Sequence, residues 1–186
     1  PLCFPTARAA YGRLSRLITL GRRRARKGDC TLHLRDVFEH SGGQLFISLP
    51  PPVPDDAYRT HLHTLREMLG RDIWLAGRCR YHGDDAARLW ALAQLGVETR
   101  IPMVATNDAR MHVPDRKPLM DVLTCIRLHC TVDRAGFRLA ANAERHLKPP
   151  AETARVFRRP PEAVVRTLGS AGPGERALAG RDREGG

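Results

Sequence analysis

The alternation of short apolar runs with amphipathic stretches between residues 45 and 106 constrains the fold more than any other feature. Each run has the length of a buried strand, and a segment with apolar residues at helical spacing separates it from the next. This order is typical of parallel βαβ units, so the sequence predicts an α/β fold rather than a helical bundle. We expect about three strands, at residues 45–49, 72–79 and 101–106.

Helices are expected between and around these strands. Asp55 suits the N-terminus of a helix that runs to Leu69, and Asp84 opens a second helix that Gly96 would end. The remaining helices are expected at Thr6–Leu20 (ended by Gly21), Leu34–His40, Pro118–His129 and Ala151–Arg158. Three strands are too few for a closed barrel, and their edges would need neighbours that the chain does not supply.

Length and composition favour a single cytoplasmic unit. The 186 residues suffice for one domain with a core. No stretch approaches the roughly 20 apolar residues that cross a bilayer, and the N-terminal residues do not have the pattern of a signal peptide, so we expect no membrane and a cytoplasmic location. Residues 169–186 are rich in Gly, Ala, Arg and Glu without periodicity, and we expect a disordered tail there. The five cysteines include no CxxC pair, which favours reduced, structural thiols over a zinc site.

The chain is strongly basic, with 31 Lys and Arg residues against 20 Asp and Glu. Such an excess suits a nucleic-acid partner, although a GC-rich genome also enriches arginine. A second basic cluster at Arg145, His146 and Lys148 suits a linker before a capped helix. The densest basic run could bind a phosphate backbone, or it could form a solvated loop. No aromatic side chains that could stack on bases are interleaved in it. The run comprises Arg22, Arg23, Arg24, Arg26 and Lys27.

One aspartate lies where a metal site could form. Asp108 follows the third predicted strand, and α/β folds gather reactive side chains at the carboxyl ends of parallel strands. If strand geometry persisted, Asp108 and His112 could bind a metal, but Arg110 would lie between them and repel it. A turn aspartate is the alternative. His61 and His63 lie in a predicted helix and would point to opposite sides.

Four longer segments resemble one family. They are FPTARAAYGRLSRLITLGRRRARKGDC at Phe4–Cys30, VATNDARMH at Val104–His112, KPLMDVLTCIRLH at Lys117–His129 and NAERHLKPPAE at Asn142–Glu152. Together they resemble the PHP domain of the bacterial C-family DNA polymerases, which are similar to the polymerase III α-subunit, and especially the error-prone branch. The resemblance extends from about Phe4 to Leu168.

The resemblance implies part of a distorted (β/α) barrel. Residues 1–150 would form the middle and C-terminal part of the PHP domain, after the first strands of the barrel. Residues 151–168 would form a helical junction toward the palm, which the chain lacks. The parent enzyme would copy DNA during damage-tolerant and repair synthesis, with magnesium held by palm aspartates. DNA and the remainder of the polymerase chain would be its partners, and this chain alone would not polymerise DNA.

Two departures from the family concern the metal site. Arg110 stands where many PHP domains have a histidine, and Arg78 stands at the position of a mid-domain glutamate. These cations make zinc or manganese at this site doubtful and favour a structural PHP domain. Two alternatives stay open: a stand-alone PHP metal-dependent phosphoesterase and a non-catalytic nucleic-acid-binding module.

Overall fold

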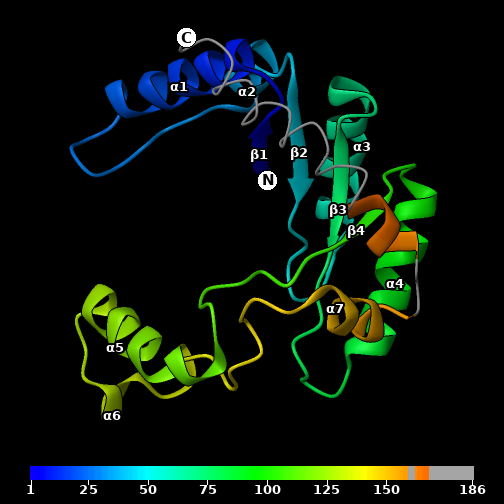
Figure 1. Cartoon of the computed structure of the whole chain (residues 1–186). Coiled ribbons are helices and arrows are strands. Elements are labelled where there is room, and N and C mark those ends of the chain that lie inside the picture. The colour runs from blue at the N-terminus through cyan, green and yellow to red at the C-terminus, as the bar shows by residue number, and fades with distance from the viewer. Residues whose placement is uncertain (159–161, 168–186) are drawn as a thin grey trace, which may run out of the picture.

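The fold is built on a mixed four-stranded sheet. The computed structural model describes residues 1–158 and 162–167. The strands are β1 (Leu2–Pro5), β2 (Gln44–Ser48), β3 (Ile73–Gly77) and β4 (Met103–Ala105). They lie in the order β1-β2-β3-β4, with β2, β3 and β4 parallel and β1 antiparallel to β2 (Figure 1). The predicted α/β class is confirmed.

The sequence prediction missed β1. This strand pairs Leu2 with Ile47 and Phe4 with Leu45, so the expectation that the chain supplies no neighbour for β2 was wrong. Only four residues form the strand, and one of them is Pro5, which is depleted in strands. Its existence depends on a partner about 40 residues away, and a local pattern cannot show such a partner.

A hydroxyl group covers part of the other sheet edge. Residues 162–167 are helical. The amide of Ala105 in β4 donates to Oγ1 of Thr167 at 3.0 Å, and the same oxygen lies 3.0 Å from the carbonyl oxygen of Ala105. The backbone groups of an edge strand otherwise lack partners. Thr167 therefore satisfies part of this edge from a segment that the sequence pattern did not connect to it.

The described residues contain seven labelled α-helices besides the helical segment 162–167; every predicted helix is present in the predicted order, and α6 was not predicted. The 3-10 turns η1 (Pro114–Arg116) and η2 (Gly136–Arg138) precede α5 and follow α6. The predicted start beside Asp55 is confirmed, because its Oδ1 accepts a hydrogen bond from the amide of Tyr58 at 2.8 Å. The helices are α1 (Arg8–Arg23), α2 (Leu34–Glu39), α3 (Asp56–Leu69), α4 (Asp85–Glu98), α5 (Lys117–Leu128), α6 (Val132–Ala135) and α7 (Pro150–Val156).

Two glycines that the sequence suggested as helix ends lie inside helices. Helix α1 continues past Gly21, and α4 continues past Gly96. A Cβ atom at Gly96 would lie 2.8 Å from the carbonyl oxygen of Ile101, and one at Gly21 would lie 2.6 Å from Sγ of Cys30. Position 96 therefore needs glycine because the backbone of Ile101 passes very close to the helix, whereas side chains of the following loop lie against Gly21; neither glycine ends its helix.

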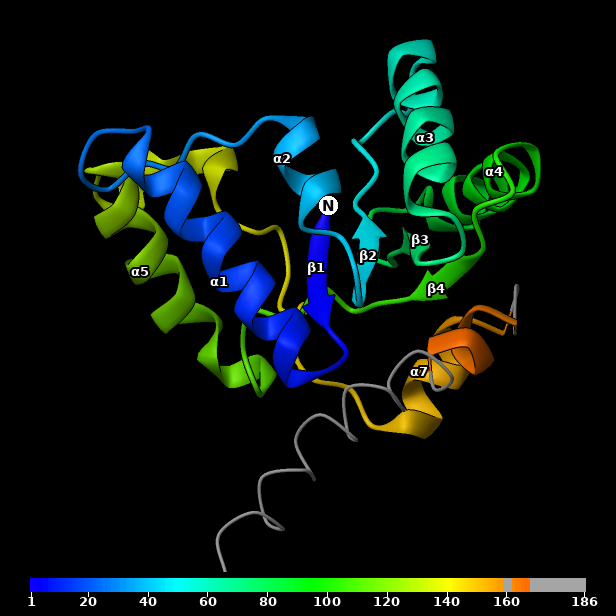
Figure 2. The same cartoon turned by 90° about the horizontal axis from the view of Figure 1, so that it is seen from above.

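The hydrophobic core lies between the sheet and the pair α3 and α4. Both helices lie on the same side of the sheet in two views (Figures 1 and 2). Their inward side chains pack on those of β2 and β3, with Leu62 and Leu65 from α3 fully buried. This face includes Phe46, Leu62, Leu65, Ile73, Leu75, Leu89, Leu92, Leu95 and Met103.

The opposite face of the sheet is apolar but only partly covered within the described residues. The strand register places Leu2, Phe4, Leu45, Ile47 and Trp74 on this face. Leu2 is 41% exposed and Phe4 is 47% exposed, and the other three are half-buried. We refer to these five residues as the open sheet face. An apolar surface of this kind is usual where further polypeptide packs.

Helices α5 and α6 project from the rest of the molecule, on the side of the sheet away from α3 and α4 (Figures 1 and 2). Helix α5 carries an exposed apolar stripe at helical spacing, formed by Leu119, Val122, Leu123 and Ile126. In the part of the chain that the structure describes, no helix is long and apolar enough to cross a bilayer.

Candidate functional site

Asp108 lies in a turn beyond the carboxyl end of β4. The strand ends at Ala105, and Asp108 adopts a left-handed conformation with φ of 46° while its amide donates to Oγ1 of Thr106. The strand alternation considered for Asp108, Arg110 and His112 is therefore wrong. The chain turns away from β4 because it pairs with a later segment, in which the carbonyl of Arg145 accepts from the amide of Arg110 at 2.8 Å.

Three arginines surround the Asp108 carboxylate. Its Oδ2 lies 2.5 Å from Nη2 of Arg145, 3.2 Å from Nη1 of Arg78 and 3.3 Å from Nη2 of Arg80. Two further bonds fix these cations, from Arg145 Nε to the carbonyl of Asp108 and from Arg78 Nη2 to the carbonyl of Pro50. The four side chains are 13–29% exposed, so the ion pairs are partly shielded from water. We call this group the arginine clamp.

The charges of the clamp are unbalanced. Burial alone would raise the pKa of Asp108, but hydrogen bonds and charge from Arg145 and Arg78 outweigh it and lower that pKa. Burial, followed by repulsion from Arg80, lowers the pKa of Arg78. One ionised carboxylate thus faces three guanidinium groups, which leaves a net positive charge at the carboxyl ends of β3 and β4.

The residues around Asp108 do not fit a divalent metal. Both predicted ligands are placed by the structure, and His112 is exposed to solvent while the Asp108 carboxylate is taken by guanidinium groups. Within residues 1–158 and 162–167, no group of three or more His, Cys, Asp or Glu side chains is arranged to hold a metal ion. The three guanidinium groups next to this carboxylate would also repel a metal cation. The geometry therefore gives no support to metal binding through Asp108 and His112.

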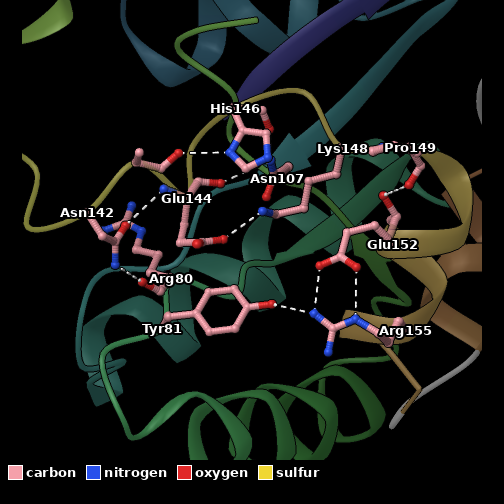
Figure 3. Close-up of polar contacts among 12 residues, drawn as sticks. Arg80, Tyr81, Asn107, Asn142, Glu144, His146, Lys148, Pro149, Glu152 and Arg155 are labelled. Atoms are coloured by element: carbon pink, nitrogen blue, oxygen red, sulfur yellow. Dashed lines mark hydrogen bonds and ion pairs between the residues drawn. The ribbon is translucent and has the colours of Figure 1, made fainter. Parts of the chain in front are cut away.

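The segment 142–149 ties the loops that follow β3 and β4 together (Figure 3). Asn142 donates through Nδ2 to the carbonyl of Arg80 at 2.7 Å and accepts from the amide of Glu144 at 3.1 Å. Asn107 donates to the carbonyl oxygens of Glu144 and His146. Each amide side chain thus bridges two segments that lie far apart in the sequence.

Lys148 is held inside this network rather than presented to a partner. Its side chain is only 4% exposed, and Nζ lies 2.7 Å from Oε2 of Glu144 and 5.8 Å from the centre of the Tyr81 ring (Figure 3). Arg155 of α7 contacts the Tyr81 hydroxyl at 3.4 Å and pairs with Glu152 through two nitrogens. The cluster that resembled a linker in the sequence is therefore a structural junction between α7 and the loop after β3.

The sequence pattern did not predict that Arg78, Arg80 and Arg145 are partners of Asp108. A signal was available for two of them, because Arg78 and Arg80 follow β3 as Asp108 follows the neighbouring β4. No comparable signal existed for Arg145, which lies 37 residues beyond Asp108 in a segment without regular structure.

The predicted nucleic-acid-binding run divides into two parts. Arg24 forms an ion pair with the buried Asp36. The other basic residues of the run are exposed, and their side chains make no hydrogen bond or ion pair with any described residue; they are Arg22, Arg23, Arg26 and Lys27. Nucleic-acid binding by this run stays a prediction.

The ion pair at Asp36 should make the fold sensitive to acid. The Arg24 guanidinium and the amide of His33 lower the pKa of Asp36 to about 2. An unfolded aspartate titrates near pH ~3.9. The stabilisation is therefore complete above about pH 4 and is lost as the pH falls toward 2. We expect Asp36→Asn to flatten the pH dependence of the melting temperature in this window, measured by circular dichroism. An unchanged slope would contradict the role of this pair.

No family model matches the chain. Comparison with curated proteins nevertheless finds relatives that share one class. The chain is 50% identical over 167 residues to a DNA polymerase of Caulobacter vibrioides, 46% identical over 173 residues to one of Bradyrhizobium sp., and 47% identical over 167 residues to one of Ruegeria pomeroyi. Each match covers 90% of this chain and 15% of the relative. The chain is therefore homologous to a segment of DNA polymerases.

The names of these relatives also define one group of DNA polymerases. All three relatives are error-prone DNA polymerases, and 54 matches are significant. The resemblance to the error-prone branch is confirmed. The chain spans about 15% of the length of the relatives that it matches.

Proposed function

We propose that the chain is a segment of an error-prone DNA polymerase that acts in the cytoplasm. Identity of 50% across 90% of the chain is the observation that carries this proposal. Residues 1–150 would form the middle and end of a PHP domain, and 151–168 would lead toward the polymerase palm. The parent enzyme would extend primers by templated nucleotidyl transfer in damage-tolerant and repair synthesis. The arrangement of the described residues supports a structural role for this segment within that enzyme.

Magnesium ions would supply charge stabilisation to the transferring phosphoryl group in the parent enzyme. We assign them to aspartates of the palm and none of their ligands to this chain. The residues of this chain would instead hold the polypeptide in shape. The arginine clamp joins the ends of β3 and β4 to segment 142–149, and Thr167 covers the edge of β4. The guanidinium groups of Arg78, Arg80 and Arg145 thus link these segments, which is a role that a bound metal ion could otherwise perform.

Two uncovered apolar surfaces support a place inside a larger protein. One is the open sheet face, and the other is the stripe formed on α5 by Leu119, Val122, Leu123 and Ile126. In a barrel, the inward face of the sheet is filled by side chains from the remaining strands. We infer that the remainder of the polymerase packs on both surfaces.

The alternative of a metal-dependent phosphoesterase is not favoured, because it would need Asp108 as a metal ligand and three guanidinium groups occupy that carboxylate. A nucleic-acid-binding role is compatible with the polymerase proposal, since a polymerase segment can also contact DNA.

A chimeric polymerase tests the proposal. The matching segment of the Caulobacter vibrioides relative would be replaced by residues 1–168 of this chain, and primer extension would be measured on intact and abasic templates. We expect activity within about tenfold of the parent, equivalent to about 1.4 kcal/mol. The isolated chain should extend no primer.

The matched control is the same relative with this segment deleted, which should be inactive. A chimera that folds with the melting temperature of the parent but extends no primer would contradict the proposal. So would primer extension by the isolated chain.

A further inference from the structure

A pocket of about 590 Å³ lies between the projecting helix α5 and the loops that follow β3 and β4. Its volume falls within the range of about 300–1,000 Å³ typical of ligand-binding sites. Arginines dominate its charged lining, and they come from five different segments of the chain. These residues are Arg80, Arg110, Arg127, Arg138 and Arg145. We call this the arginine pocket.

The positive charge of the pocket is not balanced by its own residues. Asp121 is the only carboxylate among the lining residues, and Nζ of Lys117 donates to it at 2.6 Å. The nearby Asp108 is already shared by the three cations of the clamp. The side chains of three further arginines make no hydrogen bond or ion pair with any described residue; they are Arg110, Arg127 and Arg138.

Arg80, one of the lining residues, has a buried donor without a partner. Its Nε is buried and has no hydrogen-bond partner, and it is the only such side-chain atom among residues 1–158 and 162–167. A buried donor without a partner is destabilising. Phosphate oxygens suit the arginines that line this pocket, because they can accept two parallel hydrogen bonds from one guanidinium group.

An aromatic side chain completes the pocket. Phe137 lies beside Arg138 in η2, is fully exposed and lines the same space. Proteins that bind single-stranded nucleic acid combine a basic groove with aromatic rings on which bases stack. The basic run Arg22–Lys27 lacks such a ring.

We propose that the arginine pocket binds an unpaired nucleotide of single-stranded DNA. The phosphates would contact Arg110, Arg127 and Arg138, and a base would stack on Phe137. The choice of DNA among phosphate-bearing ligands rests on the proposed polymerase function. Binding can be measured on this chain without any polymerisation, so failure of this proposal and failure of the chimera are separate results.

The test is fluorescence anisotropy of a labelled oligothymidylate of about 12 nucleotides, a length within the site sizes of single-strand binders. The triple variant Arg110→Gln/Arg127→Gln/Arg138→Gln should bind at least about tenfold more weakly. The salt dependence should fall by about 2 in the slope of log K against log[salt], because each phosphate contact contributes ~0.7. Phe137→Ala should weaken binding about tenfold.

The matched control removes three charges from exposed arginines outside both the pocket and the basic run, through Arg16→Gln/Arg71→Gln/Arg100→Gln, and should change affinity less than about twofold. All substituted side chains are exposed, so melting temperatures should stay unchanged. Equal losses in both triple variants would overturn the proposal. So would wild-type affinity of Phe137→Ala combined with full displacement by pyrophosphate, which would identify a free phosphate site. Tighter binding of oligouridylate would overturn the choice of DNA.

Discussion

Replacing Asp108 with alanine is expected to lower the free energy of unfolding by about 2–3 kcal/mol. Removal of one partner from a buried ion pair typically costs about 3–5 kcal/mol, because the other charge is left without compensation. Partial exposure of the clamp reduces this figure, but Asp108→Ala leaves three guanidinium groups facing one another without an anion. Urea unfolding followed by circular dichroism gives the free energy directly.

The matched control for Asp108→Ala is Glu67→Ala. Glu67 is an exposed residue of α3 whose side chain makes no hydrogen bond or ion pair in the described part of the chain, and its loss should change stability by less than about 0.5 kcal/mol. A second control adds manganese to the wild-type chain. If manganese raised the melting temperature of the wild type but not of Asp108→Ala, the aspartate would be a metal ligand and the clamp interpretation would fail.

Leu65→Ala is expected to destabilise the chain by about 3 kcal/mol. The side chain is fully buried where α3 meets the sheet, and truncation of a buried leucine costs about 2–5 kcal/mol through lost burial and the cavity left behind. The same substitution at Leu123, which is 53% exposed on α5, should cost less than about 0.5 kcal/mol. Thermal and urea unfolding of the two variants measure the difference.

The two variants Leu65→Ala and Leu123→Ala also test whether other polypeptide packs on the apolar stripe of α5. Equal losses in the isolated chain would show that α5 is packed against something, which contradicts its position as an exposed projection (Figure 1). In the chimeric polymerase the prediction for Leu123→Ala reverses. There we expect a loss of about 1 kcal/mol or more, because the remainder of the enzyme would cover the stripe on α5.

Local pattern predicted much of this fold. Helical spacing of apolar residues identified α3 and its buried side chains Leu62 and Leu65, because a helix brings residues three and four apart to one face. Short continuous apolar runs identified β2, β3 and β4, because a run of this length is typical of a buried strand. The disordered tail predicted for 169–186 lies outside the described residues.

Contacts between distant segments produced what the sequence reading missed. Strand β1 exists because Leu2–Pro5 meets β2, and position 96 in α4 needs glycine because an added Cβ atom would lie only 2.8 Å from the carbonyl oxygen of Ile101. Neither fact has a local signature. A glycine required by close packing and a glycine that ends a helix look identical in sequence.

For the site around Asp108, too, local sequence predicted one part and contacts between distant segments decided the rest. The sequence placed Asp108 at the carboxyl end of a parallel strand, where functional side chains gather, and it identified the homologous polymerase family through long matching segments. Only the tertiary structure decided what Asp108 contacts, since its partners Arg78, Arg80 and Arg145 lie 28 to 37 residues away. Chain folding brings their charges within hydrogen-bonding distance, and at that distance electrostatics makes the carboxylate the centre of an arginine clamp rather than an available metal ligand.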